Sequence, residues 1–389
     1  MAFKDKIDEW RERFLEVIDF KKDENKVDDL VEKTEIPPSY LARFGYFPIE
    51  NVDQLFGRDY ELELLKKAYD NWKISNNLLL VISDQGIGVS SLINSSCHLY
   101  PHAKIIDETV EISNLEGLLI QLKKALSITA DCQSLNDVKQ AIVEEEVVVI
   151  ENVERLFLRR IGGFSLLDEF LLFMHETKEK IYWICTMNRY SHYYLNQVKS
   201  VNANFPSQIS VRGLDNDVIK QILENRNDGY NLTVLKPLSL KPSGRRKLRK
   251  ASPEERIIMV RNRYYRKLLE YSNGHISRAF IYWKHSIVRI NGKNVFLREP
   301  EISIKSALGK DDLFVLEAIL QHTYIKLSEL KLVLRNSYKA SLLILEQLKE
   351  KELVSQRSIY GNKNVYQINL KFIEEVKVLL KTHLNRNIK

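Results

Sequence analysis

The chain has 389 residues, with 59 Lys and Arg, 52 Asp and Glu and a formal net charge of +7. This length predicts two or three domains of about 100–200 residues each, and the mild positive charge permits contact with phosphate or an acidic partner without requiring it. The three cysteines lie too far apart in sequence for a CxxC zinc site or a disulfide framework. Apolar runs are far shorter than the ~20 residues that span a bilayer, and the charged N-terminus lacks the apolar stretch of a signal peptide, so a cytoplasmic protein is expected.

The N-terminal part is predicted to contain two helices, a strand and a glycine-bearing loop. Apolar residues recur at helical spacing over residues 3–20, and again over 60–73 after the segment Phe56-Gly57-Arg58-Asp59. The continuous apolar run Leu78–Ile82 is typical of a buried parallel strand. It leads into Ser83–Ser91, after which another helix begins. Strand, glycine-bearing loop and helix in this order indicate a phosphate-binding βα unit.

Further strands alternate with helices as far as residue 212. The strands are predicted at 104–111, 146–151, 181–187 and 208–212, and the helices between them at 115–126, 135–144 and 166–176. Alternation of this kind predicts an α/β fold with a mostly parallel sheet.

The rest of the chain is predicted to be helical and to end in a winged helix. A helix at 215–226 precedes the segment 235–256, which contains prolines and the cationic cluster 245–250, and two helices follow at 254–272 and 275–290. Residues 310–384 then follow the order helix, helix, helix, β-hairpin and helix, which is the plan of a winged helix. The predicted domains are therefore an N-terminal helical extension (1–50), an α/β core (51–213), a helical segment with a basic insertion (214–300) and a winged helix domain (301–389).

The loop after the first strand has the backbone of a phosphate-binding loop but lacks its cation. In the pattern G-x-x-x-x-G-K-[ST], glycines let backbone amides point at phosphate, the Lys neutralises phosphate charge and the hydroxyl binds Mg²⁺. The chain has Ser83 at the first Gly, Gly88 at the second, Val89 at the Lys and Ser90 at the hydroxyl, with Gly86 as a further glycine. The alternative is a tight strand-to-helix connection with no ligand.

Polar residues also end the next two predicted strands. Glu151 and Asn152 follow the apolar run Val147–Ile150, where one carboxylate would bind Mg²⁺ and a second would orient water. Glu151 suits the first role, but an amide such as that of Asn152 cannot act as a base. Asn188, at the end of the following strand, could contact a γ-phosphate or water. Each of these residues could equally be an ordinary strand end or helix cap.

These features in this order resemble the AAA+ ATPase superfamily, and most of all its branch of origin-recognition initiators and other ATPases with a C-terminal winged helix. The resemblance covers about residues 50–370. It implies an ATP or ADP site with Mg²⁺, in which 83–90 is the Walker A loop, Glu151-Asn152 ends Walker B, Asn188 is sensor 1 and 214–300 is the lid. The residues that the resemblance brings to the nucleotide are Arg58, Gly86, Ile87, Gly88, Val89, Ser90, Ser91 and Arg278, the last as sensor 2, with Ser90 and Glu151 as metal ligands. Arg58 could instead fix the entry of its helix, and Arg278 could be a surface or ion-pair residue.

The departures from this pattern predict a pseudo-ATPase. Loss of one charge-assisted hydrogen bond to phosphate, about 1.5–3 kcal/mol, lowers affinity roughly 10–100-fold, and hydrolysis needs the same charge in the transition state. The expected function is a regulatory or assembly scaffold with little or no hydrolysis, which works with a protein partner or as a homo-oligomer. The alternative is an active ATPase with a substitute cation, for which Lys104, Arg159 or a neighbouring chain are candidates.

A further alternative is a DNA-binding protein that resembles initiators and uses its winged helix. The helix predicted at 338–351 has Lys339 and Ser341 near its N-terminal end, where base contacts are usually made. The predicted wing carries Arg357 and Lys363. The far end of the same helix is acidic, so contact with a protein partner is an equal alternative.

Overall fold

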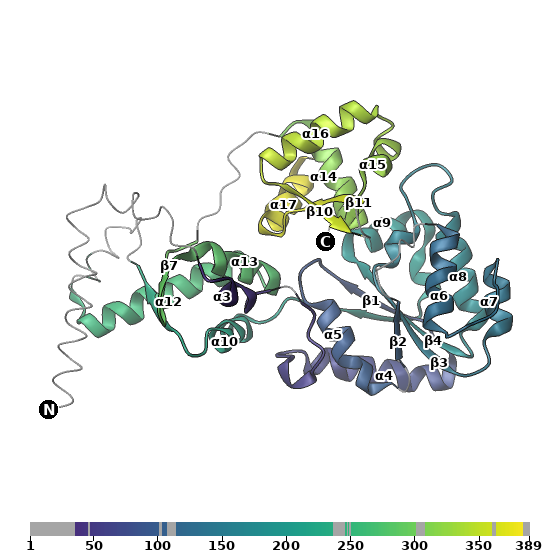
Figure 1. Ribbon diagram of the computed structural model, residues 1–389, viewed down its shortest axis with the longest axis horizontal. Helices are drawn as coiled ribbons and strands as arrows, with labels where there is room; N and C mark the ends of the chain where they lie inside the picture. Colours follow the sequence, from purple (N-terminus) through teal and green to yellow (C-terminus); the bar gives the residue numbers. More distant parts are fainter. Residues whose placement is uncertain are drawn as a thin grey trace. The chain divides into compact units, whose positions relative to one another are not determined.

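The computed structural model describes residues 36–45, 47–100, 103–106, 114–235, 250–300, 308–359 and 363–383, together with 246 and 248 (Figure 1). The helix predicted over 3–20 and most of the cationic cluster 245–250 lie outside these residues. The chain forms two compact units. One joins the segment before residue 47 to 215–302, and the other joins 47–214 to 303–389. Within the described part of the chain, no helix has the length and apolar character needed to cross a membrane.

The larger unit is built on a five-stranded parallel sheet, as the sequence predicted. The strand order is β2 (Ala103–Ile106), β3 (Glu146–Ile150), β4 (Ile181–Asn188), β1 (Leu79–Ser83) and β5 (Ser207–Ser210). All five residues of β1 and all eight of β4 are buried. Central strands covered by helices on both faces favour apolar side chains on both faces. This explains the unbroken apolar runs at 79–82 in β1 and 181–185 in β4.

Alternate strand residues pack into two layers. Leu80 and Trp183 belong to the layer shared with α6 (Leu115–Ala125), α7 (Leu135–Ala141) and α8 (Ser165–Thr177). Val81 and Tyr182 belong to the layer shared with α4 (Asp59–Ser75) and α5 (Val89–Ser96). The helices of Figure 1 accordingly lie on both faces of the sheet. The register pairs Ser83 of β1 with Asn188 of β4, so the polar ends of these strands meet at one edge.

The same unit includes the winged helix predicted at the C-terminus. Its helices are α14 (Lys310–His322), α15 (Leu327–Leu334), α16 (Tyr338–Glu350) and α17 (Ile373–His383). The wing strands β10 (Val354–Ile359) and β11 (Lys363–Ile368) pair antiparallel, and the short strand β9 (Tyr324–Ile325) completes their sheet. The fold class predicted from the sequence, a parallel α/β core with a winged helix, is therefore confirmed.

The smaller unit contains helices and a three-stranded sheet that the sequence analysis missed. Its helices are α3 (Pro38–Ala42), α10 (Asn216–Arg226), α12 (Pro253–Ser272) and α13 (Ile276–Ser286), and its strands are β6 (Asn231–Val234), β7 (Ile287–Asn291) and β8 (Asn294–Leu297). The helix predicted over 275–290 ends at Ser286, because the β-branched residues that follow favour a strand. The two-residue turn Gly292-Lys293 joins β7 to β8, with Gly292 at φ +54°.

Candidate functional site

The loop between β1 and α5 adopts the curled course that its glycines permit. Gly86 has a φ of +81° and Gly88 a φ of +97°, values that a residue with a Cβ adopts only under strain. Helix α5 begins directly after Gly88, so Val89 and Ser90 form its first turn. The first turn of a helix leaves backbone N–H groups without intrahelical partners, which is why this position suits an anion. Val89 stands where a Lys would neutralise that anion.

Arg58 holds the loop to its surroundings from the start of α4. Its guanidinium is 2% exposed and donates hydrogen bonds to the carbonyl oxygens of Ile87, at 2.8 Å, and Arg212, at 2.7 Å. It also pairs with Glu61 at 2.9 Å. Burial lowers the pKa of Arg58, while Glu61 favours its charged form. These contacts give Arg58 a structural role between the loop and the start of α4. Its contact with nucleotide stays a prediction.

The two predicted metal ligands lie side by side. The Ser90 hydroxyl donates to the Glu151 carboxylate at 2.6 Å. Asn152 follows in the left-handed conformation, with φ +56°, and its backbone N–H donates to the Thr186 hydroxyl at 2.9 Å. The described residues hold no group of three or more His, Cys, Asp or Glu that could hold a metal ion. One hydroxyl and one carboxylate nevertheless fit Mg²⁺, which takes most of its ligands from water and phosphate.

Ser91 is positioned by the chain that leads into the core. Its hydroxyl accepts a hydrogen bond from the Ile49 backbone N–H at 3.0 Å. The Ser95 hydroxyl, one turn later on α5, donates to the Ile49 carbonyl at 3.2 Å. The two serines therefore fix the lead-in segment against α5.

Asn188 joins the sheet edge to the winged helix. Its amide nitrogen donates to the Thr323 hydroxyl at 2.6 Å, to the Leu320 carbonyl at 3.2 Å and to the Glu154 carboxylate at 3.2 Å. Its amide oxygen caps helix α9 (Arg189–Lys199) by accepting two backbone N–H groups at 2.8 Å. Both ends of the amide are thus used in the structure, and a role of Asn188 at a γ-phosphate stays a prediction.

Glu154 is the carboxylate at the centre of this contact. It lies in the 3₁₀ helix η3 (Val153–Leu156), is 0% exposed and accepts the Thr323 hydroxyl at 2.6 Å. Burial raises the pKa of Glu154, although hydrogen bonds from Thr323 and Asn188 and the charge of Arg155 act in the opposite direction. Thr323 itself has φ +62°, a strained value for a β-branched residue.

Two arginines extend the same interface. Arg155 donates to the Tyr324 carbonyl at 2.7 Å, lies 4.0 Å above the Tyr324 ring and pairs with Glu329 at 3.5 Å. Arg159 pairs with Glu317 at 3.3 Å and donates to Gln321. Arg159, considered above as a substitute cation for the loop, is therefore engaged by α14. The other candidate, Lys104, lies on β2, which is separated from β1 by β3 and β4.

His322 lies against this interface without a charge. It is 0% exposed, its ring packs 4.8 Å from that of Phe157, and its Nε2 atom accepts the Arg159 backbone N–H at 3.4 Å. Burial lowers the pKa of His322 to about 3, and the charges of Arg155 and Arg159 act in the same direction.

Arg278, the predicted sensor 2, lies on α13 in the smaller unit. Its side chain is 1% exposed and donates to the Tyr282 hydroxyl at 2.7 Å. The alternative that Arg278 is a surface residue is therefore wrong. Its contact with nucleotide stays a prediction.

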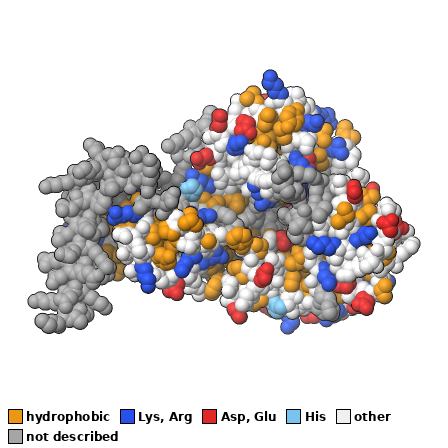
Figure 2. Space-filling model, viewed as in Figure 1, with side chains coloured by type: hydrophobic (Ala, Val, Ile, Leu, Met, Phe, Trp, Pro, Cys, Tyr) orange, Lys and Arg blue, Asp and Glu red, His pale blue; other side chains and the backbone are white. Residues whose placement is uncertain are grey.

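The predicted nucleic-acid residues divide by exposure. Lys339 and Arg357 are exposed on the winged helix, whereas Ser341 is 0% exposed and cannot touch a duplex. Ser341 faces inward because it is four residues before Leu345 on the buried side of α16. Lys363 begins β11. On the face seen in Figure 2, Lys and Arg side chains are interspersed with Asp and Glu, in keeping with the modest net charge.

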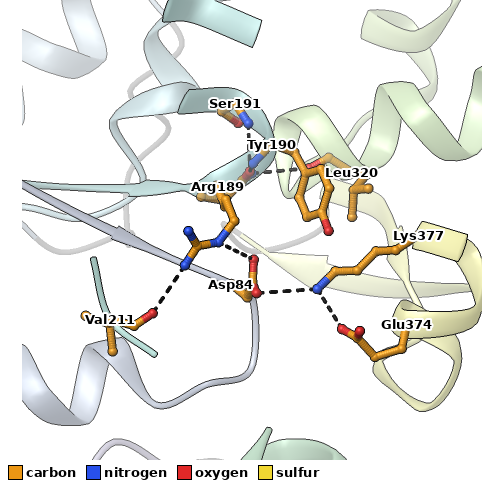
Figure 3. A network of polar contacts seen from close by, with 9 residues as sticks. Asp84, Arg189, Tyr190, Ser191, Val211, Leu320, Glu374 and Lys377 are labelled. Atoms are coloured by element: carbon orange, nitrogen blue, oxygen red, sulfur yellow. Dashed lines mark hydrogen bonds and ion pairs between the residues drawn. The ribbon is translucent and has the colours of Figure 1, made fainter. Parts of the chain in front are cut away.

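A cluster that the sequence analysis missed surrounds Asp84, the second residue of the loop. Arg189 of α9 pairs with Asp84 at 3.2 Å, and Lys377 of α17 pairs with it at 3.4 Å (Figure 3). Lys377 also pairs with Glu374 at 2.6 Å. These residues are separated by 105 and 293 positions in sequence, and no local pattern indicates that they meet.

Comparison with known proteins rests on structure alone, because no protein-family profile and no curated protein matches the sequence. The ORC2 protein of Aeropyrum pernix, solved with ADPNP and ADP, is 14% identical with a TM-score of 0.44, over 88% of this chain and 98% of that one. A Walker-type ATPase of Pyrococcus abyssi is 15% identical with a TM-score of 0.42, over 86% and 99%. The Aeropyrum pernix ORC1 protein, solved with DNA, is 13% identical with a TM-score of 0.37, over 85% and 93%. These likenesses concern the fold alone.

Proposed function

We propose that this protein is a P-loop module that does not turn over ATP at ordinary enzyme rates and that serves as a platform for its winged helix. The observation that carries the proposal is the position of Asn188. Its amide is bound by Glu154, Thr323 and the Leu320 carbonyl at the junction with the winged helix. An amide held in this way supports the fold and is not free to orient water.

The composition of the loop supports the same proposal. Ser90 and Glu151 retain a pair of oxygen donors for Mg²⁺. The loop has Val89 in place of a cation, and Asn152 in place of a carboxylate that could accept a proton from water. Positioning and charge stabilisation supply most of the catalysis of phosphoryl transfer. A site without these two groups can retain weak nucleotide binding while it loses turnover.

The direct test is phosphate release from ATP and Mg²⁺ by the full chain. We expect the wild type to release phosphate no faster than Ser90→Ala, which removes the hydroxyl expected at the metal. Turnover of about 1 per second, within the ordinary range of enzymes, that Ser90→Ala abolishes would overturn the proposal. Binding of a fluorescent ATP analogue, measured on the same samples, separates loss of binding from loss of chemistry.

DNA binding is the second candidate function. It is supported by a run of exposed polar residues at and before the start of α16, which comprises Arg335, Asn336, Ser337, Tyr338 and Lys339. Arg357 on β10 adds an exposed cation. The N-terminal end of the second helix of such a motif is the part that commonly enters a major groove.

Fluorescence anisotropy with a labelled duplex tests this candidate. The variant Lys339→Glu with Arg357→Glu should weaken binding and reduce the slope of log affinity against log salt by about 1 for each phosphate that the protein no longer neutralises. Lys66→Glu with Lys124→Glu, at exposed positions on α4 and α6, is the control for the equal change in net charge. Absence of duplex binding by the wild type at low salt would remove this candidate.

A further inference from the structure

A cavity of about 410 Å³ lies beside the phosphate loop, between the core and the last helix of the winged helix. The loop contributes Asp84, α9 contributes Arg189, the chain after β5 contributes Arg212, and α17 contributes Lys377 and Lys381. Figure 3 shows that Arg189 of α9 and Lys377 of α17 both point toward Asp84. The volume is within the range of about 300–1,000 Å³ that small-molecule sites occupy.

The walls of the cavity carry an excess of positive charge. Four cationic side chains, the two arginines and two lysines above, face two carboxylates, Asp84 and Glu374, which leaves an excess of two positive charges. Asp84 is shared by Arg189 and Lys377, and Glu374 pairs with Lys377. Within the described part of the chain, no acidic side chain forms an ion pair with Arg212 or Lys381, and both are exposed.

We propose that this cavity binds a phosphate chain, either that of a nucleotide or a free polyphosphate. Arg212 and Lys381 supply the uncompensated charge at its open side, and Lys377 supplies a cation already fixed beside the loop. A compact anion with several charges suits this arrangement because each oxygen can accept a charge-assisted hydrogen bond from a different element.

The proposed site adjoins the curl of the loop, with which it shares Asp84 and Ile87, but its cations come from other elements. Ser90 and Glu151, where Mg²⁺ is expected, do not line the cavity. The cations belong to the winged helix and to the residues that follow β4 and β5. The inference therefore does not depend on whether ATP is hydrolysed. A bound anion would compete with Asp84 for Lys377 and would bridge the winged helix to the core.

The experiment is calorimetric titration of the full chain with tripolyphosphate, ATP and adenosine at about 50 mM salt, where surface electrostatics are only partly screened. The principal variant is Arg212→Glu with Lys381→Glu, whose two exposed positions can be changed without disturbing the core. Its control is Lys66→Glu with Lys124→Glu, an equal change of net charge at exposed positions on α4 and α6. Val89→Glu places a negative charge in the curl of the loop and reports on binding there.

We expect the principal variant to weaken tripolyphosphate binding tenfold or more, in line with about 1.5–3 kcal/mol per charge-assisted hydrogen bond, and the control to leave it within about twofold. Asp84→Asn should strengthen binding, because it removes a negative charge and releases Lys377. If ATP binds more tightly than tripolyphosphate, the ligand is a nucleotide; equal affinity indicates the phosphate chain alone. Equal binding by the principal variant and its control, loss of binding in Val89→Glu alone, or no binding by the wild type would each overturn the proposal.

Discussion

Two polar sites lie at the same edge of the parallel sheet and differ in what surrounds them. At the end of β3, Ser90 and Glu151 form a part-exposed pair beside the loop. At the end of β4, Asn188 and Glu154 are buried against Thr323 of the winged helix. The first site is partly exposed, whereas the second is packed against the winged helix of the same chain. Residues that the resemblance assigns to one catalytic centre are therefore divided between a part-exposed pair and a domain interface.

The difference has an energetic consequence. A polar group near solvent that loses its partner regains a hydrogen bond from water, so its net contribution to stability is about 1 kcal/mol. A buried polar group that loses its partner stays unsatisfied, and several such groups in one network are affected together. The stability of the larger unit should therefore depend strongly on the Asn188 network and weakly on the Ser90 pair.

Asn188→Ala should have the largest effect on stability. The change removes the cap of α9, about 1 kcal/mol, and leaves the Thr323 hydroxyl and the Glu154 carboxylate without their amide partner, at about 1–3 kcal/mol for each buried group. We expect a total loss of about 3–7 kcal/mol, measured by urea unfolding. Ser90→Ala should cost less than about 1 kcal/mol. Equal losses in the two variants would remove the distinction between the sites, and Asn71→Ala, at an exposed position on α4, is the control.

Arg155→Ala should have the next largest effect. The guanidinium binds the Tyr324 carbonyl, lies against the Tyr324 ring and pairs with Glu329, and it is 6% exposed. Its removal leaves these groups buried without their cation, and we expect a loss of about 2–4 kcal/mol in the same unfolding experiment. The neighbouring Arg160 is exposed, so Arg160→Ala is a matched control. A loss no larger than that of the control would mean that the interface does not hold the winged helix.

Val89→Lys tests the part-exposed site by restoring its missing cation. The new ammonium should reach phosphate in the curl of the loop and raise affinity for ATP and Mg²⁺ about 10–100-fold, equivalent to about 1.4–2.8 kcal/mol. Fluorescence of a labelled ATP analogue measures the change. Val89→Gln, which is long but uncharged, should give less than a threefold change. If the two variants bind alike, the loop does not form a phosphate site.

The contrast between the two sites also marks what could be predicted from the sequence. The unbroken apolar run of β4 and the glycines of the loop specify their local structure, because burial on both faces and positive φ allow few other residues. The order of elements in the winged helix was predictable from the helical spacing of its apolar residues and the strand pair that follows. Asp84, Glu154 and Lys377 were missed, since each acquires its role from a residue more than 100 positions away. The hairpin turn at Gly292-Lys293 carried a local signal, its glycine, that was overlooked.

The smallest expected effect concerns pH, through two buried groups that act in opposite directions. The pKa of His322 is lowered by burial to about 3, so between pH 6.5 and pH 3 the unfolded chain binds a proton that the folded chain does not. His322 therefore lowers the free energy of unfolding as pH falls. The pKa of Glu154 is raised by burial, so above about pH 4.5 the folded chain retains a proton that the unfolded chain has lost. Glu154 therefore raises the free energy of unfolding as pH falls toward about 4.5 and has no further effect below it.

His322→Phe should reveal this opposition, because it keeps a ring against Phe157 and removes one of the two titrating groups. Between pH 6 and pH 5, the free energy of unfolding of the wild type should fall relative to that of the variant by about 1.4 kcal/mol per pH unit. Urea unfolding across this range measures the difference, and a replacement of the exposed His98 by Gln provides the control. A difference that does not vary with pH would show that His322 takes up a proton in the folded chain. The interface would then tolerate a positive charge on His322, although burial and the two neighbouring arginines oppose that charge.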